Sequence, residues 1–366
     1  MRNPRTMKVR VISFVVFLLI TFSGSLFAQF DSEYNSLQRR ITGIFSENSN
    51  GVFRVMAAHT TYDEKGDLQI GQSSGTGFFI SREGHILANA SVVMNSNRTW
   101  FKFKGVDYSA ELIGVEASNN LALLKANNLP EDFTYFIPEP NQSLPEVGSM
   151  AIMVSCPWTF DPSPLWTMVA GADTSFANRE FDTTHFRINH TVRGGEGGAP
   201  LFDLNGRFLG ILVRSTPAEI GYGYVLPATS VLRIRDDLLF AGKFIHGWIG
   251  IDLGIRSTIR DGRQIYLTEI MTDSPSAQAG LQKDDVLVRM GDYAILSISD
   301  VRNAMFSARA GQFLDVQVFR DGVLQDFTVK VTERPEELPK TPEPAEITNP
   351  ADENNSDTAT DEEKPS

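Results

Sequence analysis

The feature that most constrains the fold is a series of short apolar segments between residues 51 and 240. Gly, Asn and Asp residues divide these segments at regular intervals, and no helical period intervenes. Short strands at such spacing predict an all-β barrel or sandwich architecture. Residues 244–333 differ, because strand-like segments there surround one helical stretch over 298–308. They therefore predict a separate, smaller module.

Both ends of the chain are predicted to lie outside these domains. Residues 1–28 combine four basic side chains, an apolar stretch over 11–22 and a terminal small residue, which is typical of a signal peptide. An uncleaved membrane anchor is the alternative, since 11–28 is about the minimum length that spans a bilayer. Residues 29–50 predict an N-terminal arm with an amphipathic helix, which would pack on the body or contact another subunit.

Composition and charge limit the partners. The 366 residues are 42% hydrophobic, enough for ordinary buried cores, and the formal net charge of −12 comes without a basic stripe that could bind nucleic acid. Residues 334–366 hold ten acidic and three basic side chains and no apolar period, which predicts a disordered acidic tail. The single cysteine, Cys156, excludes an intramolecular disulfide and a Cys-rich metal site. No cofactor or metal is expected.

Residues 194–201, Gly-Gly-Glu-Gly-Gly-Ala-Pro-Leu, form the most informative motif. Four glycines in five positions allow the backbone to approach another group closely before the chain enters a strand. Two interpretations remain open from these residues alone. The motif is either a tight turn between strands or a nest of N–H groups that accepts an anion or a developing oxyanion.

Several motifs, taken in order, resemble the HtrA/Deg family. They are Ser-Gly-Thr-Gly-Phe-Phe-Ile-Ser at 74–81, Leu-Ala-Leu-Leu-Lys at 121–125, the glycine motif at 195–201, Asn-Gly-Arg-Phe-Leu-Gly-Ile at 205–211 and Ser-Pro-Ser-Ala-Gln-Ala-Gly-Leu at 274–281. The resemblance covers about 50–333. It implies a mainly β protein in which a trypsin-like double β-barrel over 51–240 precedes a PDZ domain over 244–333. The predicted signal peptide indicates that the protein is exported, to the periplasm or out of the cell.

The same resemblance implies a catalytic triad, and the sequence departs from it at all three positions. Ser91 stands where the family has its His base, Asn120 where it has Asp, and Gly197 where it has the Ser nucleophile. A hydroxyl is no general base near pH 7, an amide does not stabilise an imidazolium, and glycine has no side chain with which to attack. Gly195, Glu196 and Gly197 would form the remnant of the oxyanion loop.

Glu196 replaces a neutral Asn of the family in that loop. A carboxylate there would oppose a developing oxyanion unless Arg193 pairs with it, and this pairing is a hypothesis. The histidines show neither triad context nor metal-ligand spacing, and each is predicted to be a strand or surface residue. They are His59, His85, His185, His190 and His246. Cys156 matches a turn of the family and is predicted to be a packed thiol.

In the second module the resemblance implies a peptide groove. The family's carboxylate-binding loop corresponds to Trp248, Ile249, Gly250 and Ile251. Val301 and Met305 on the predicted helix are weaker candidates for the groove wall, with simple core packing as an equal alternative. Such a groove captures a C-terminal strand by adding it to a sheet edge.

Together these features predict an exported HtrA-like pseudoprotease. It would bind C-terminal or unfolded peptide segments through the PDZ domain and the vestigial cleft, in a chaperone-like or regulatory role. The resemblance implies a homo-oligomer, typically a trimer, or an assembly with active relatives. Two alternatives remain open: an active serine endopeptidase with a non-standard site, and a structural partner in an envelope assembly that uses the acidic tail as its contact.

Overall fold

The computed structural model describes residues 35–62, 65–140, 142–176, 179–258 and 262–335. The predicted signal peptide over 1–28 and the acidic tail beyond residue 335 lie outside these described residues. Within them, no helix is both long enough and apolar enough to span a bilayer.

Six antiparallel strands close the first barrel, in the order β1-β2-β3-β6-β5-β4. They are β1 (Val52–Tyr62), β2 (Leu68–Phe79), β3 (His85–Asn89), β4 (Arg98–Phe103), β5 (Val106–Glu116) and β6 (Leu121–Ala126), with the short helices η1 (Ser49–Gly51) and α2 (Ala90–Val93). Alternating side chains of the strands point inward. Phe53, Phe79 and Phe101 meet there with ring centroids 4.5–5.5 Å apart.

A second barrel repeats this design in the order β10-β11-β12-β9-β8-β7. Its strands are β7 (Met150–Ser155), β8 (Ser163–Phe176), β9 (Arg179–Ile188), β10 (Pro200–Asp203), β11 (Phe208–Ser215) and β12 (Gly223–Pro227). The helix α3 (Ala228–Ala241) follows and packs on β5, β6 and β11, so it contacts both barrels. These two barrels confirm the predicted trypsin-like architecture.

The second module forms a separate sheet in the order β14-β15-β16-β18-β19. Its elements are β13 (Gly247–Trp248), β14 (Ile251–Thr258), β15 (Gly262–Ile270), α4 (Pro275–Ala279), β16 (Val286–Met290), β17 (Tyr293–Ala294), α5 (Ile298–Ser307), β18 (Phe313–Arg320), β19 (Val323–Lys330) and β20 (Thr332–Glu333). A capping box between Ser297 and Asp300 begins α5. Among the described strands β14 pairs only with β15, which leaves β14 as a sheet edge.

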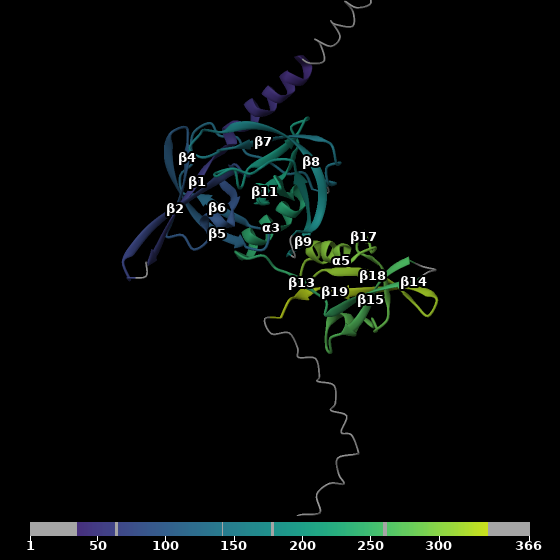
Figure 1. Ribbon diagram of the computed structural model, residues 1–366. Coiled ribbons are helices and arrows are strands. Elements are labelled where there is room, and N and C mark those ends of the chain that lie inside the picture. Colours follow the sequence, from purple (N-terminus) through teal and green to yellow (C-terminus); the bar gives the residue numbers. More distant parts are fainter. Residues whose placement is uncertain (1–34, 63–64, 141, 177–178, 259–261, 336–366) are drawn as a thin grey trace, which may run out of the picture.

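Helix α5 faces the barrels and contacts β9 (Figure 1). The amide N–H of Thr184 on β9 donates to Asn303 Oδ1 on α5 at 2.8 Å. Phe244, in the linker, stacks on Phe306 with centroids 5.1 Å apart. The domains are therefore joined by a specific contact as well as by the linker.

The predicted N-terminal helix is present over 35–48 and leads into the first barrel (Figure 1). Ile44 is buried, and Ile41 and Phe45 pack against a cluster that contains residues of both barrels. The apolar face of this helix thus packs on the body of the protein.

Candidate functional site

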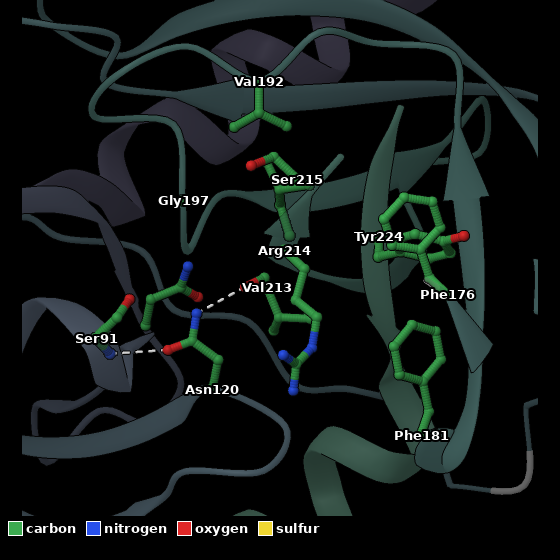
Figure 2. Close-up of a pocket in the computed structure, with 12 residues that line it drawn as sticks. Ser91, Asn120, Phe176, Phe181, Val192, Gly197, Val213, Arg214, Ser215 and Tyr224 are labelled. Atoms are coloured by element: carbon green, nitrogen blue, oxygen red, sulfur yellow. Dashed lines mark hydrogen bonds between the residues drawn. The ribbon is translucent and has the colours of Figure 1, made fainter. Parts of the chain in front are cut away.

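Ser91, Asn120 and Gly197 line one cavity of about 420 Å³ between the two barrels (Figure 2). Ser91 lies on α2, directly after β3, and Asn120 lies in the turn before β6. Gly197 comes from the loop that precedes β10 in the second barrel. The structure therefore brings together the three positions where the sequence departs from a triad. None of them supplies an imidazole or a carboxylate.

Asn120 is held by two hydrogen bonds that suit an amide. Its Oδ1 accepts from the Ser91 amide N–H at 2.8 Å, and its Nδ2 donates to the Val213 carbonyl at 2.6 Å (Figure 2). Its backbone adopts φ +56°, a left-handed conformation that Asn tolerates better than most residues. A carboxylate could not donate to Val213, so the hydrogen bond from Asn120 to the second barrel requires an amide at this position.

The glycine loop is anchored to the first barrel through Thr76. The Thr76 amide donates to the Gly197 carbonyl at 2.8 Å, and Thr76 Oγ1 donates to the Gly195 carbonyl at 2.7 Å. The Cys156 amide in turn donates to Thr76 Oγ1 at 2.9 Å, and Cys156 is buried, which confirms a packed thiol. Among the described residues, the amides of Gly195 and Gly197 have no hydrogen-bond acceptor.

Glu196 is buried, with 1% of its surface exposed. Its Oε2 accepts from His190 Nε2 and from the Arg193 backbone amide, both at 2.7 Å. Burial raises the pKa of this carboxyl, but the hydrogen bonds from His190 and the Arg193 amide outweigh burial and hold the pKa below its usual value. Glu196 is therefore ionised at neutral pH, and it is not among the residues that line the cavity.

This geometry corrects two predictions. The Arg193 side chain is exposed and forms no ion pair with any described residue; its backbone amide donates the hydrogen bond to Glu196, and its charge helps to lower the pKa of that carboxyl without direct contact. His190, predicted to be a strand or surface residue, is buried beside Glu196. A buried carboxylate needs hydrogen-bond donors, and the nearest imidazole supplies one.

The rest of the cavity was not predicted from the sequence. An aromatic wall consists of Phe176, Phe181 and Tyr224, and Arg214 extends between this wall and Asn120 (Figure 2). Asn89 also lines the cavity and is buried. The only available signal was the position of Asn89 two residues before Ser91, which stands where the family has its His base. Within the described ranges, no group of three or more His, Cys, Asp or Glu residues has a geometry that could hold a metal ion.

His185, on β9 beneath Phe181, is a buried neutral imidazole. Its ring centroid lies 4.6 Å from that of Phe181, and its Nδ1 donates to the Thr183 carbonyl at 2.9 Å. Burial lowers the pKa of His185 to about 4, and the nearby Arg214 acts in the same direction. Between about pH 6.5 and pH 4, His185 therefore stays neutral in the folded protein but takes up a proton in the unfolded chain.

We expect stability to fall between about pH 6.5 and pH 4 for this reason. The contribution of His185 is complete above the unfolded pKa of 6.5 and disappears as the pH approaches the folded value of about 4. The loss amounts to as much as about 3 kcal/mol. Urea unfolding at pH 7 and at pH 4.5 measures this loss. In the His185→Asn variant, the free energy of unfolding should differ less between the two pH values than it does in the wild type. An equal difference in this variant would contradict a neutral buried His185.

The PDZ positions lie at one end of the second sheet. Gly250 has φ +77°, and a Cβ there would lie 2.3 Å from Ser274 Cβ, so the loop requires glycine. Ile249 is buried in the core, Trp248 is half-buried, and Ile251 begins the edge strand β14. On α5, Val301 is a core residue, and Met305 packs partly exposed against that core. The loop and the edge strand are thus adjacent, while Val301 serves mainly in packing.

Comparisons with known proteins agree with this architecture. A family model of the trypsin-like peptidase domain matches residues 75–211, and a PDZ domain model matches 251–331. A probable periplasmic serine endoprotease, DegP-like, of Pseudomonas fulva is 26% identical over 277 residues, which cover 72% of this chain and 57% of the relative. One of the same description from Chlamydia trachomatis is 25% identical over 280 residues, with 72% and 54% coverage. This chain spans about half the length of these relatives.

Two solved structures share the fold. The HtrA-type protease AlgW with decapeptide gives a TM-score of 0.64 at 18% identity, over 81% of this chain and 99% of that one. A serine endoprotease from Yersinia pestis gives a TM-score of 0.54 at 20% identity, over 81% and 98%. Both extend across the barrels and the PDZ domain.

Proposed function

The chain is homologous to the DegP/HtrA proteins, with a trypsin-like peptidase domain followed by a PDZ domain, and on this premise we propose that it binds peptide or unfolded polypeptide without cleaving it. In this proposal the protein is a pseudoprotease with a chaperone-like or regulatory role. It acts after export, in the periplasm or as a secreted protein. Its relatives are described as periplasmic endoproteases, which supports an exported location.

One observation carries the proposal: the cavity between the barrels persists, but Ser91, Asn120 and Gly197 line it where a base, a carboxylate and a nucleophile are required. Loss of triad members leaves a rate only about 10³- to 10⁴-fold above that in water, from the oxyanion hole and binding. Enzymes usually need about 10⁶-fold or more. A chain held in this cavity therefore stays intact.

An active peptidase with a non-standard site gains little support from the histidine contacts. His59 Nε2 lies 2.7 Å from Ser73 Oγ, but Ser73 Oγ itself donates to the Val92 carbonyl at 2.6 Å. With the Ser73 hydroxyl directed at Val92, His59 Nε2 is placed to donate to Ser73 Oγ and, at 3.2 Å, to the Val92 carbonyl, which is not the arrangement of a base that accepts the Ser73 proton. His190 and Glu196 form a base–carboxylate pair, yet no described hydroxyl is hydrogen-bonded to that imidazole.

The PDZ domain supplies the second binding surface of the proposal. The loop of the PDZ domain that contains Gly250 leads directly into β14, whose outer edge has no partner strand among the described residues. A peptide C-terminus would add to β14 as a further strand, with its carboxylate against the amides of the loop. A homo-oligomer, a trimer by family resemblance, or an assembly with active relatives, would place several such edges together.

An aggregation assay tests the holding function directly. Reduced insulin, whose B chain aggregates, is followed by light scattering with and without the mature protein. We expect equimolar protein to suppress scattering while the B chain keeps its full length on gels. Unchanged aggregation would contradict the holding function, and fragmented B chain would contradict the absence of cleavage.

A further inference from the structure

The loop before β14 offers two backbone donors without acceptors. The amide N–H groups of Ile249 and Gly250 have no hydrogen-bond acceptor among the described residues. The Ile249 carbonyl accepts from the Ser276 amide at 3.0 Å, and the carbonyl of the next residue accepts from the Met271 amide at the same distance. Because these bonds fix the carbonyls of the loop, its N–H groups stay available for an anion, such as the carboxylate at the end of a peptide.

The position of this loop sets the direction and register of a strand added to β14. The loop precedes β14, so a peptide held there by its C-terminus runs antiparallel to β14 along the free edge of the sheet (Figure 1). Its last residue then lies opposite Ile251, and its penultimate residue lies opposite Asp252. Residues that lie opposite each other in an antiparallel pair direct their side chains to the same face. The penultimate side chain of the peptide therefore shares a face with Asp252.

That face carries two carboxylates side by side. Asp252 on β14 is the direct cross-strand partner of Glu269 on β15, and like charges in such a pair repel each other. Asp252 is exposed and Glu269 is half-buried. Neither forms an ion pair or a side-chain hydrogen bond with any described residue. A cation on an added strand would lie in the same row and relieve this repulsion.

Two cations of the same module do not pair with these carboxylates. Arg256 is engaged elsewhere on β14, because its Nε donates to Gln264 at 3.0 Å and its guanidinium lies 5.1 Å from the centre of the Tyr266 ring. Lys283 lines the same surface hollow as Glu269 but forms no ion pair with it or with any other described residue. Charge complementarity at this edge therefore favours a ligand with a basic side chain.

We propose that the PDZ domain selects peptides with a basic side chain, Lys or Arg, at the penultimate position. The terminal carboxylate binds the amides of Ile249 and Gly250, and the peptide adds to β14 as a further strand. Neighbouring strands lie about 4.8 Å apart, so the basic side chain lies beside Asp252, and Glu269 adds its charge from the next strand. This selection rests on the proposed peptide-binding function and goes beyond it by naming the ligand class.

Matched peptides test this selection. Fluorescent decapeptides share eight residues and a C-terminal valine with a free carboxylate, and they differ only in Lys or Gln at the penultimate position. We expect the full mature protein to bind the Lys peptide about fivefold more tightly in fluorescence anisotropy, as suits an exposed ion pair. This preference should shrink when the salt concentration rises from about 0.05 M to about 0.5 M, because salt screens exposed charges.

Matched variants assign the preference to the two carboxylates. Asp252→Asn combined with Glu269→Gln removes both charges and should abolish the difference between the Lys and Gln peptides, while binding of the Gln peptide shows that the variant is folded. Asp326→Asn is the control, because it removes one exposed charge on β19 at the opposite edge of the same sheet. This variant should keep the fivefold preference.

Three results would contradict the proposal in distinguishable ways. Equal affinity of the wild type for the Lys and Gln peptides would overturn the basic selection and leave peptide capture intact. The Lys peptide with an amidated C-terminus should bind at least about tenfold more weakly than the free acid. If it binds equally well, the loop does not set the register and the selection fails. If no peptide with a free C-terminus binds, capture by the PDZ domain fails, and the selection fails with it.

Discussion

Replacing Gly198 with alanine is expected to lower the free energy of unfolding by about 3 kcal/mol or more. Gly198 has φ +91°, and a Cβ there would lie 2.1 Å from the Thr76 carbonyl oxygen and 3.2 Å from the Asn89 amide nitrogen. These obstacles are backbone atoms of the first barrel, which cannot rotate away as a flexible side chain can. The loop would have to withdraw from Thr76, and the contact between the barrels would be lost.

Gly206→Ala is the matched control for this change. Gly206 has a similar φ of +80°, but a Cβ at this position would have no atom within 4 Å of it. This variant should lose only about 1 kcal/mol, from the left-handed conformation alone. Urea unfolding at pH 7 measures both variants. Equal losses would contradict the close docking of the glycine loop on Thr76.

Glu196→Ala is expected to cost about 3 kcal/mol at pH 7. Removal of the carboxylate leaves His190 Nε2 and the Arg193 amide, which now donate to it at 2.7 Å, without their acceptor in a buried site. Glu196→Gln retains an acceptor oxygen and should cost about 1 kcal/mol. The free energies of unfolding of the two variants, measured with denaturant, distinguish the contribution of the hydrogen bonds to Glu196 from that of its side-chain packing.

The dependence on pH adds a second readout for Glu196. Because the folded protein holds the pKa of Glu196 below the ordinary value of 4.5, its stabilising contribution is complete above that value. It disappears as the pH falls below 4.5 toward the folded pKa. The stability gap between wild type and Glu196→Gln should therefore narrow in acid. A gap that stays constant down to about pH 3, well below the ordinary carboxyl pKa, would contradict an ionised, hydrogen-bonded Glu196.

Much of the fold could be predicted from local patterns. Strands such as Arg98–Phe103 alternate between exposed and buried side chains, and the turns between strands carry glycine. Both the strands and the turns that end them can therefore be recognised in the sequence. The helical stretch predicted over 298–308 is present as α5 (Ile298–Ser307), and the structure adds its cap at Ser297. Closure of the strands into two barrels depends on pairings between strands that are distant in the sequence. The prediction of two barrels therefore came from the family resemblance more than from the periodicity.

The site was predictable only where a motif marked it. Ser91, Asn120 and Gly197 were found because the family resemblance assigns a triad role to each of these positions, and the structure places all three on one cavity. Arg214 lies three residues beyond the matched stretch 205–211, and Phe181 lies on a strand without a motif, so only the three-dimensional arrangement reveals them. The pairing of Glu196 with His190 was missed because the exposed Arg193 offers a formal charge nearby, whereas burial selects the imidazole and a backbone amide.

The measurement that tests the central claim most directly is cleavage of unfolded casein by the purified mature protein. Products are followed by mass spectrometry over many hours, with an active HtrA-type protease as the positive control and the Ser91→Ala variant, purified in parallel, to detect contaminating peptidases. We predict intact casein with the wild type and the variant alike. Casein fragments that appear with the wild type and disappear with Ser91→Ala would contradict a protein that binds its ligand without cleaving it.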